Sequence, residues 1–178
     1  MTGIFSPVEP NHDAGKLKPG VVGLFTAEIA AHEMQPQSRV NLIAGVGIEG
    51  DRYAKKEGRW SDRPKPEHQL TLIAAEVLED ISLELGIEFT ARECRRNIVT
   101  SGIELNNLVG KIVKIGESAV ILATKPNHPC RYLERLIDKP VMESLLGRSG
   151  LNCEILRGGI VNIGDQIVEV TEEWRSDC

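Results

Sequence analysis

Apolar residues along most of the chain recur at strand spacing. Residues 21–29 and 39–46 are rich in β-branched and other apolar side chains, and residues 69–73 alternate between polar and apolar. These patterns predict three strands, and residues 96–100 predict a fourth. A polar stretch at 55–67, which contains two prolines, separates the second strand from the third and predicts a long surface loop.

The second half of the chain continues the strand pattern. Residues 111–115 and 119–124 are separated by a glycine-containing turn and predict a β-hairpin. Residues 151–156 and 166–170 predict two last strands, and the glycine-rich segment 158–165 predicts the turn that joins them.

Helical spacing occurs in a few short segments. Residues 74–85 have it and end at a glycine, and residues 90–93 match a capping box. Residues 129–137 and 140–145 predict two further helices, and residues 105–108 predict a helical turn. The chain is therefore predicted to be mostly β (α+β), a closed β-barrel with a few peripheral helices, with glycines at its corners.

A single domain accounts for the whole pattern. The chain has 178 residues, with no internal repeat and no linker. Residues 1–19 contain three prolines and two glycines without periodicity, and they predict a loose N-terminal tail. The domain is therefore predicted to span 20–172, with residues 173–178 as a C-terminal tail.

Charge and composition narrow the range of partners. The net charge is −5 and aromatics make up 4% of residues, which argues against nucleic acid and against an anionic membrane as partners. An anionic ligand would need a local group of Arg and Lys. The four cysteines form no CxxC pair, and the first twenty residues lack a signal-peptide pattern, so a cytoplasmic protein with reduced thiols is expected.

Cys130 is the cysteine whose surroundings suggest chemistry. It follows Pro129 at the start of a predicted helix, and Arg131 adds a positive charge. A positive environment at a helix start favours the thiolate, which is a soft metal ligand and a sulfur nucleophile. The spacing alone is equally compatible with a small apolar residue packed beneath the helix.

A zinc site is a further alternative for the same region. His128 and Cys130 could supply two ligands, but no second His/Cys pair lies nearby, and zinc needs three or four ligands. The remaining histidines are interpreted as ordinary surface or loop residues: His12, His32 and His68.

Two motifs contain arginines that could hold an anion. Arg52 ends a glycine-rich segment, residues 47–52, that could also present backbone N–H groups; a plain turn capped by Asp51 is the alternative. Arg95 and Arg96 enter a predicted strand and suggest an anion such as phosphate, with surface salt bridges as the alternative.

Six stretches, in this order, together resemble the MOSC domain, named after the C-terminal part of molybdenum-cofactor sulfurases. They are GIEGDRYA (47–54), HQLTLIAAEVLE (68–79), RRNIVTSGIELNNLVG (95–110), KPNHPCRYLE (125–134), GRSGLNCEIL (147–156) and GGIVNIGD (158–165).

The resemblance implies a MOSC-type β-barrel that binds the molybdenum cofactor (molybdopterin), a pterin carrying a dithiolene and a phosphate. It places the family's pivotal cysteine, as catalytic residue and metal ligand, on Cys130. It places the positions that hold the phosphate and the pterin on Arg52, Arg96, Asn97, Thr100 and Arg148.

The chain departs from stand-alone relatives just before the Pro-Cys pair, where they often have an acidic residue or a second cysteine and this chain has Asn127-His128. It also lacks the aminotransferase-like domain of full-length sulfurases, so no pyridoxal phosphate is expected. If the chain handles sulfur, another protein must supply it.

The resemblance leaves two functions open, both acting on small molecules. In the first, the chain is an enzyme that reduces N-hydroxylated compounds at molybdenum, with electrons from a separate reductase. In the second, it is a non-catalytic module that carries a persulfide on Cys130 or the cofactor itself, with a sulfur donor protein as partner. A third interpretation, from another class, is a protein–protein adaptor with an inert Cys130.

Overall fold

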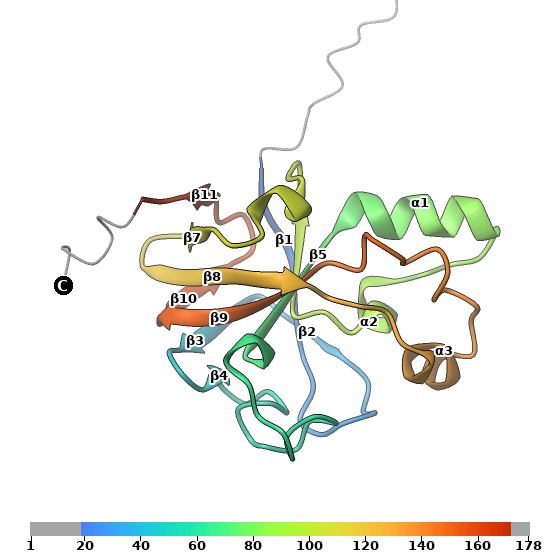
Figure 1. Ribbon diagram of the computed structural model, residues 1–178, viewed down its shortest axis with the longest axis horizontal. Helices are drawn as coiled ribbons and strands as arrows, with labels where there is room; N and C mark the ends of the chain where they lie inside the picture. Colours follow the sequence, from blue (N-terminus) through green and yellow to red (C-terminus); the bar gives the residue numbers. More distant parts are fainter. Residues whose placement is uncertain (1–18, 172–178) are drawn as a thin grey trace, which may run out of the picture.

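The structure, a computed structural model, describes residues 19–171 (Figure 1). The predicted tails, 1–19 and 173–178, lie outside the described residues apart from Pro19. The strands are β1 (Gly20–Thr26), β2 (Gln35–Gln37), β3 (Arg39–Ile43), β4 (Gly47–Ile48), β5 (Leu70–Ala74), β6 (Ile98–Ser101), β7 (Ile112–Ile115), β8 (Ala119–Pro126), β9 (Leu151–Arg157), β10 (Gly159–Asn162) and β11 (Ile167–Glu169). The helices are α1 (Ala75–Leu85), α2 (Ala91–Cys94) and α3 (Arg131–Ile137), with 3-10 turns η1 (Pro66–His68) and η2 (Leu105–Leu108).

Two sheets form the body of the domain. The larger has eight strands in the order β11-β7-β8-β9-β5-β6-β1-β2, and the smaller has three in the order β10-β3-β4. All pairs are antiparallel except β5 with β6. Parallel neighbours need a crossover connection, which α1 and α2 provide here. The prediction of a mostly β fold is confirmed.

The large sheet curls without closing, so the predicted closed barrel is an overstatement. Its outer strands, β11 and β2, are not paired with each other; a single bridge between Gly20 and Gln166 links the start of β1 to the segment before β11. The segment 158–165, predicted to be a turn, contains β10. Strand β10 pairs with β3, and these two strands belong to the smaller sheet rather than to one continuous barrel.

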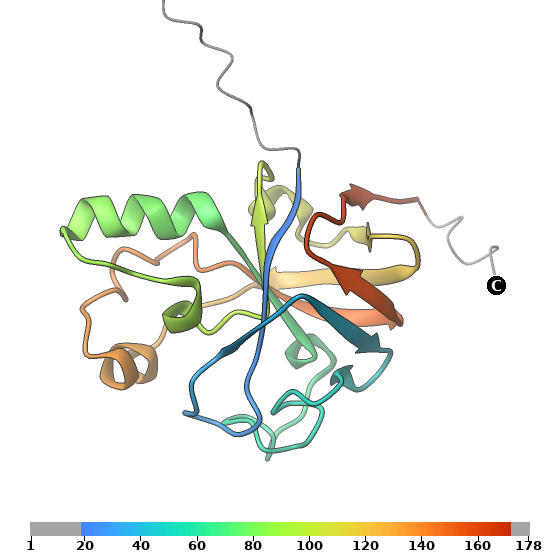
Figure 2. The ribbon, with the colours of Figure 1, turned by 180° about the vertical axis from the view of Figure 1, so that it is seen from behind.

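Strands β5 and β6 lie in the middle of the molecule and are buried on both faces. Leu72 and Ile98 belong to a core cluster between the sheets, while Ile73 and Val99 belong to a second cluster beneath the helices. Figure 2 shows the three helices on one side of these strands and β7–β11 on the other. Among residues 19–171 no helix is both long and apolar enough to pass through a bilayer.

Most predictions of local structure are confirmed, but the prediction of one helix is wrong. The hairpin of β7 and β8 is present, and Thr90 and Glu93 form both bonds of the capping box at the start of α2. The helix predicted at 140–145 is instead a series of turns. Its backbone bonds do not continue at helical spacing: the Leu145 N–H donates four residues back, to Val141, but the Leu146 N–H donates three residues back, to Glu143.

Candidate functional site

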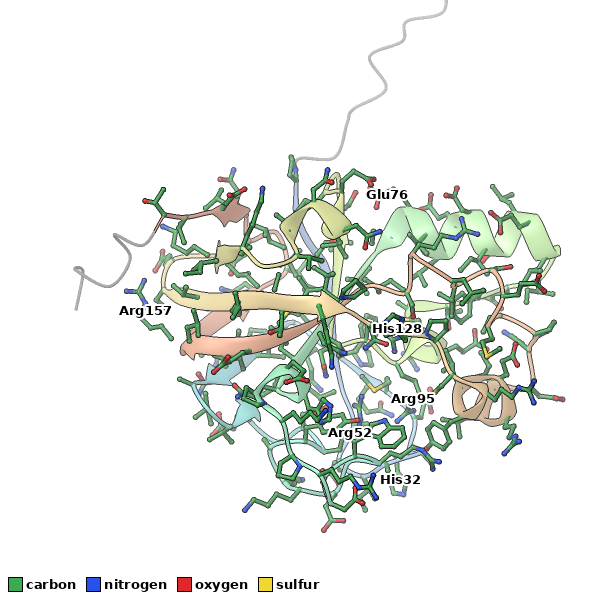
Figure 3. All side chains as sticks on the ribbon, viewed as in Figure 1. His32, Arg52, Glu76, Arg95, His128 and Arg157 are labelled. Carbon is green, nitrogen blue, oxygen red and sulfur yellow. The ribbon has the colours of Figure 1, made fainter. Side chains whose placement is uncertain are left out.

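A cavity of about 420 Å³ opens where the start of β5, the start of β6 and the end of β8 face the loop 51–65. The first residues of α3 complete its wall. Figure 3 shows Arg52, Arg95 and His128, three of its lining residues, in the region between this loop and α3. The cavity is thus built from segments far apart in sequence, which meet because β5, β6, β8 and β9 are neighbours in the large sheet.

The thiol of Cys130 reaches this cavity. Cys130 is exposed and lines it, with the extended backbone of the residue that caps α3 (φ −143°, ψ 153°). The helix itself begins at Arg131 rather than at Pro129. By contrast, Cys94 and Cys153 are free thiols buried in the core, and burial raises the pKa of each. Cys130 is therefore the described cysteine available for chemistry in the cavity.

Arg96 lies at the floor of the cavity as a buried cation. Its Nε donates to the Ser149 carbonyl oxygen at 3.0 Å, its Nη1 to the Cys94 carbonyl oxygen at 3.1 Å, and its Nη2 to Asn127 Oδ1 at 2.9 Å and Ser149 Oγ at 2.7 Å. Among residues 19–171 no carboxylate forms an ion pair with it. These four bonds fix the guanidinium without neutralising its charge.

Burial makes this charge costly. Desolvation lowers the pKa of Arg96, and a negative charge at Cys94 or Cys130 acts in the opposite direction. Because burial keeps Cys94 in the thiol form, Cys130 or a bound anion is the source of negative charge that would stabilise Arg96. A negative charge in the cavity would therefore offset part of the cost of burying Arg96.

Arg52 is the second buried arginine of the cavity, and protein acceptors fix its guanidinium. Its Nη1 lies 3.1 Å from Asp51 Oδ1 and its Nη2 donates to the Arg95 carbonyl oxygen at 3.3 Å. Asp51 in turn accepts from the backbone N–H of Ala27 and from Asn97. Asn97, predicted to bind the cofactor, does not line the cavity; it supports Arg52 through Asp51.

The whole cavity is positive. Seven cationic side chains line it, and no Asp or Glu of residues 19–171 does. These are Arg52, Arg59, Arg63, Lys65, Arg95, Arg96 and Lys125. Three of the charges are paired with carboxylates outside the lining: Lys125 with Glu67 at 2.8 Å, Arg52 with Asp51 at 3.1 Å, and Arg63 with Asp62 at 3.8 Å. In a chain of net charge −5, this is a local anion-attracting field.

Besides Asn97, two predicted site residues do not line the cavity. Thr100 is fully buried in β6, where its hydroxyl donates to the Ile73 carbonyl oxygen at 3.3 Å. Arg148 is directed to α1, with Nη2 2.5 Å from Glu84 Oε2 and Nη1 3.9 Å from Asp80 Oδ2. The structure therefore brings together Cys130, Arg52 and Arg96, and leaves Arg148 and Thr100 elsewhere.

Several lining residues were not singled out from the sequence. His68 was interpreted as ordinary, yet it lines the cavity with Nδ1 buried and without a hydrogen-bond partner among the described residues. Desolvation lowers its pKa. Desolvation also raises the pKa of the neighbouring Tyr53, whose ring centroid lies 6.2 Å from that of His68. The available signal was the loop after Arg52, a polar stretch that contains a tryptophan and five cations.

The zinc alternative gains no further ligand. His128 lines the cavity with Cys130, but residues 19–171 contain no group of three or more His, Cys, Asp or Glu side chains placed to bind a metal ion. A metal at Cys130 would therefore need ligands from a bound group rather than from neighbouring side chains.

Fold and site together define a β-rich domain with a cation-lined cavity that an exposed cysteine also lines. The model of the MOSC domain matches residues 59–168, more than half of the chain. The chain belongs to the MOSC domain family, which confirms the resemblance seen in the motifs.

One curated relative and several solved structures are similar to the chain. A protein named "Reductase" from Gibberella moniliformis (strain M3125 / FGSC 7600) is 26% identical over 164 residues, which are 86% of this chain but 28% of that protein. The chain therefore spans less than a third of that relative's length.

The similar structures support the fold. YuaD from Bacillus subtilis has a TM-score of 0.71 at 23% identity, covering 84% of this chain and 93% of that one. YiiM from Geobacillus stearothermophilus has a TM-score of 0.67 at 17% identity, covering 86% and 75%. YiiM from Escherichia coli has a TM-score of 0.65 at 21% identity, covering 86% and 70%.

Proposed function

We propose that the chain binds the molybdenum cofactor in this cavity, with Cys130 as a ligand of the metal, and that it reduces N-hydroxylated compounds. The proposal depends above all on one observation: an exposed thiol and a buried guanidinium without a carboxylate partner share one cation-lined cavity. Membership of the MOSC family supports the choice of cofactor, and the name of the Gibberella relative supports a reductase.

The residues of the cavity fit the chemical parts of this cofactor. Its phosphate would accept charge-assisted hydrogen bonds from Arg96 and Arg52, each worth about 1.5–3 kcal/mol. A thiolate at Cys130 is a soft ligand suited to its metal. The cavity volume of about 420 Å³ is within the range of small-molecule sites. Asn97 enters the proposal as a support for Arg52 rather than as a contact.

The reaction itself needs two electrons and two protons. The N–O bond of the substrate breaks, an N–H bond forms, and the oxygen leaves as water. When bound, the molybdenum centre supplies the two electrons. Solvent at the open mouth can supply the protons, and lining groups can relay them; no Asp or Glu of residues 19–171 is among these groups. Desolvation lowers the pKa of His68 and so favours the neutral ring, which can take up a proton at a ring nitrogen when an anion binds nearby.

The electrons must reach the cavity from another domain or protein. The cysteines of this chain are widely spaced and show no iron–sulfur pattern, and no flavin motif is present. We therefore propose a separate reductase as electron donor and a small molecule as substrate.

A non-catalytic carrier is the second candidate, because an exposed thiol could equally hold a persulfide. In that case sulfur would come from a donor protein, and the thiol would release it without net reduction of a substrate. Cyanide removes such a sulfur as thiocyanate, which gives a direct chemical readout.

A turnover experiment separates these functions. The purified chain, supplied with molybdenum cofactor and a reduced viologen dye, is expected to convert an N-hydroxylated amine to the amine, with about two viologen oxidised per amine formed. Dye with cofactor but without the chain is the control. A chain that retains the cofactor but gives no amine, together with cyanide-releasable sulfur, would support the carrier instead.

A further inference from the structure

Five of the seven cations of the cavity fall into two groups; the other two, Arg95 and Lys125, are half-buried and bonded to the His32 carbonyl oxygen and to Glu67. Arg52 and Arg96 are buried at the floor, where backbone and side-chain acceptors fix them. Arg59, Arg63 and Lys65 are exposed and come from one short piece of the loop at the mouth. Among residues 19–171 the one ion pair of this mouth group joins Arg63 to its neighbour Asp62 at 3.8 Å, with both side chains largely exposed. The mouth charge is therefore nearly unbalanced.

Aromatic rings hold part of this mouth group in place. The Arg59 guanidinium lies 4.2 Å from the ring centroid of Tyr132 and 5.4 Å from that of Trp60. Tyr132 belongs to α3, two residues after Cys130, so this contact joins the loop to the helix across the mouth. A guanidinium that stacks through its face keeps its in-plane N–H groups free to bind an anion.

Most of the aromatic residues of the described chain lie at this cavity. Five aromatic residues lie within 19–171, and the two phenylalanines, Phe25 and Phe89, pack in the core beneath the helices. The other three, Tyr53, Trp60 and Tyr132, line the cavity. Trp60 remains 47% exposed, so part of its ring is open to a ligand. The mouth therefore combines positive charge, of which only Arg63 has a carboxylate partner among residues 19–171, with rings on which a planar group can stack.

We propose that the mouth group, Arg59, Arg63 and Lys65, binds an anionic group of the substrate, a phosphate monoester carried on a planar conjugated ring. The ligand is the substrate of the proposed reaction, so the inference rests on the proposed function. Arg52 and Arg96 are buried and fixed by protein acceptors, whereas the mouth cations are exposed and make few such bonds, so the two groups can serve different anions. A substrate that is both planar and anionic would use the exposed ring of Trp60 and the free charges together.

The test compares two ligands that differ only in a phosphate. Calorimetric titration of the full chain with adenosine and with adenosine monophosphate is expected to show about tenfold tighter binding of the monophosphate at about 50 mM salt. At about 0.5 M salt the difference should largely disappear, because the mouth charges are exposed and screened. Arg63→Gln with Lys65→Gln should weaken monophosphate binding about three- to tenfold and leave adenosine within about twofold.

A matched control removes two cations of the same loop that do not line the cavity. Lys55→Gln with Lys56→Gln should leave both affinities unchanged. No binding of the monophosphate, no preference for it, or a preference that survives in the mouth variant would contradict the inference; the last result would place the phosphate at the floor. A chain that shows the mouth-dependent preference but reduces no N-hydroxylated compound would reject the proposed reaction and retain the anion site.

Discussion

Replacing Cys130 with serine is expected to lower both the cofactor retained after purification and the rate of reduction by at least about 100-fold. A hydroxyl is a poor replacement for a thiolate at a soft metal, and no other described cysteine reaches the cavity. Because Cys130 is exposed, the free energy of unfolding should change by less than about 0.5 kcal/mol. Turnover assays and thermal unfolding of the two proteins measure both effects.

The neighbouring Arg131 offers a matched control. It is exposed at the same helix start but does not line the cavity, so Arg131→Ser should keep most of the activity and the cofactor. If Cys130→Ser retained full activity, the thiol would not be a metal ligand. If Cys130→Ser instead unfolded the protein, the structural description of an exposed residue would be wrong.

Replacing Gly150 with alanine is expected to destabilise the fold by about 3 kcal/mol or more. Gly150 has φ +85°, and an added Cβ would overlap the carbonyl oxygen of Leu72 and lie 2.9 Å from its carbonyl carbon and 3.1 Å from the Cα of Ile73. These are backbone atoms of the central strand β5, which cannot move aside without breaking its pairing with β9.

The same change should disturb the site. The Gly150 carbonyl oxygen accepts from the Asn127 N–H at 2.7 Å, and the preceding residue, Ser149, binds Arg96 twice. Denaturant unfolding of Gly150→Ala, followed by a measurement of retained cofactor, tests both consequences.

Gly147 separates the effect of crowding from that of backbone strain. It also has a positive φ, +74°, but an added Cβ would meet nothing within 4 Å. Gly147→Ala should therefore cost only about 1–2 kcal/mol, the strain of the left-handed conformation. Equal losses for the two variants would mean that the close approach of Gly150 to β5 does not matter.

Local sequence signals predicted the elements that local chemistry determines. The capping box at Thr90 and Glu93, the glycine that ends α1 and the hairpin of β7 and β8 depend on residues near one another in sequence. The edges of the sheets, by contrast, depend on residues far apart in sequence. Whether the segment 158–165 is a turn or a strand depends on β3, more than a hundred residues earlier, and no local signal reveals that pairing.

The sequence likewise predicted some residues of the site and not others. Cys130, Arg52 and Arg96 stand beside prolines, glycines or a strand start, which made them visible in the sequence, and the structure brings them to one cavity. Arg148 resembled them, but two acidic residues one turn apart on α1, Asp80 and Glu84, bind it elsewhere. The mouth cations lie on a loop without periodicity, where only the folded chain shows which side chains face the cavity.

The molybdenum content of the purified chain tests the central claim most directly. Protein produced in cells that make the cofactor, and analysed by mass spectrometry of its metals together with its pterin, is predicted to contain close to one molybdenum and one pterin per chain. Protein that contains neither, despite being folded and produced where the cofactor is plentiful, would contradict the account.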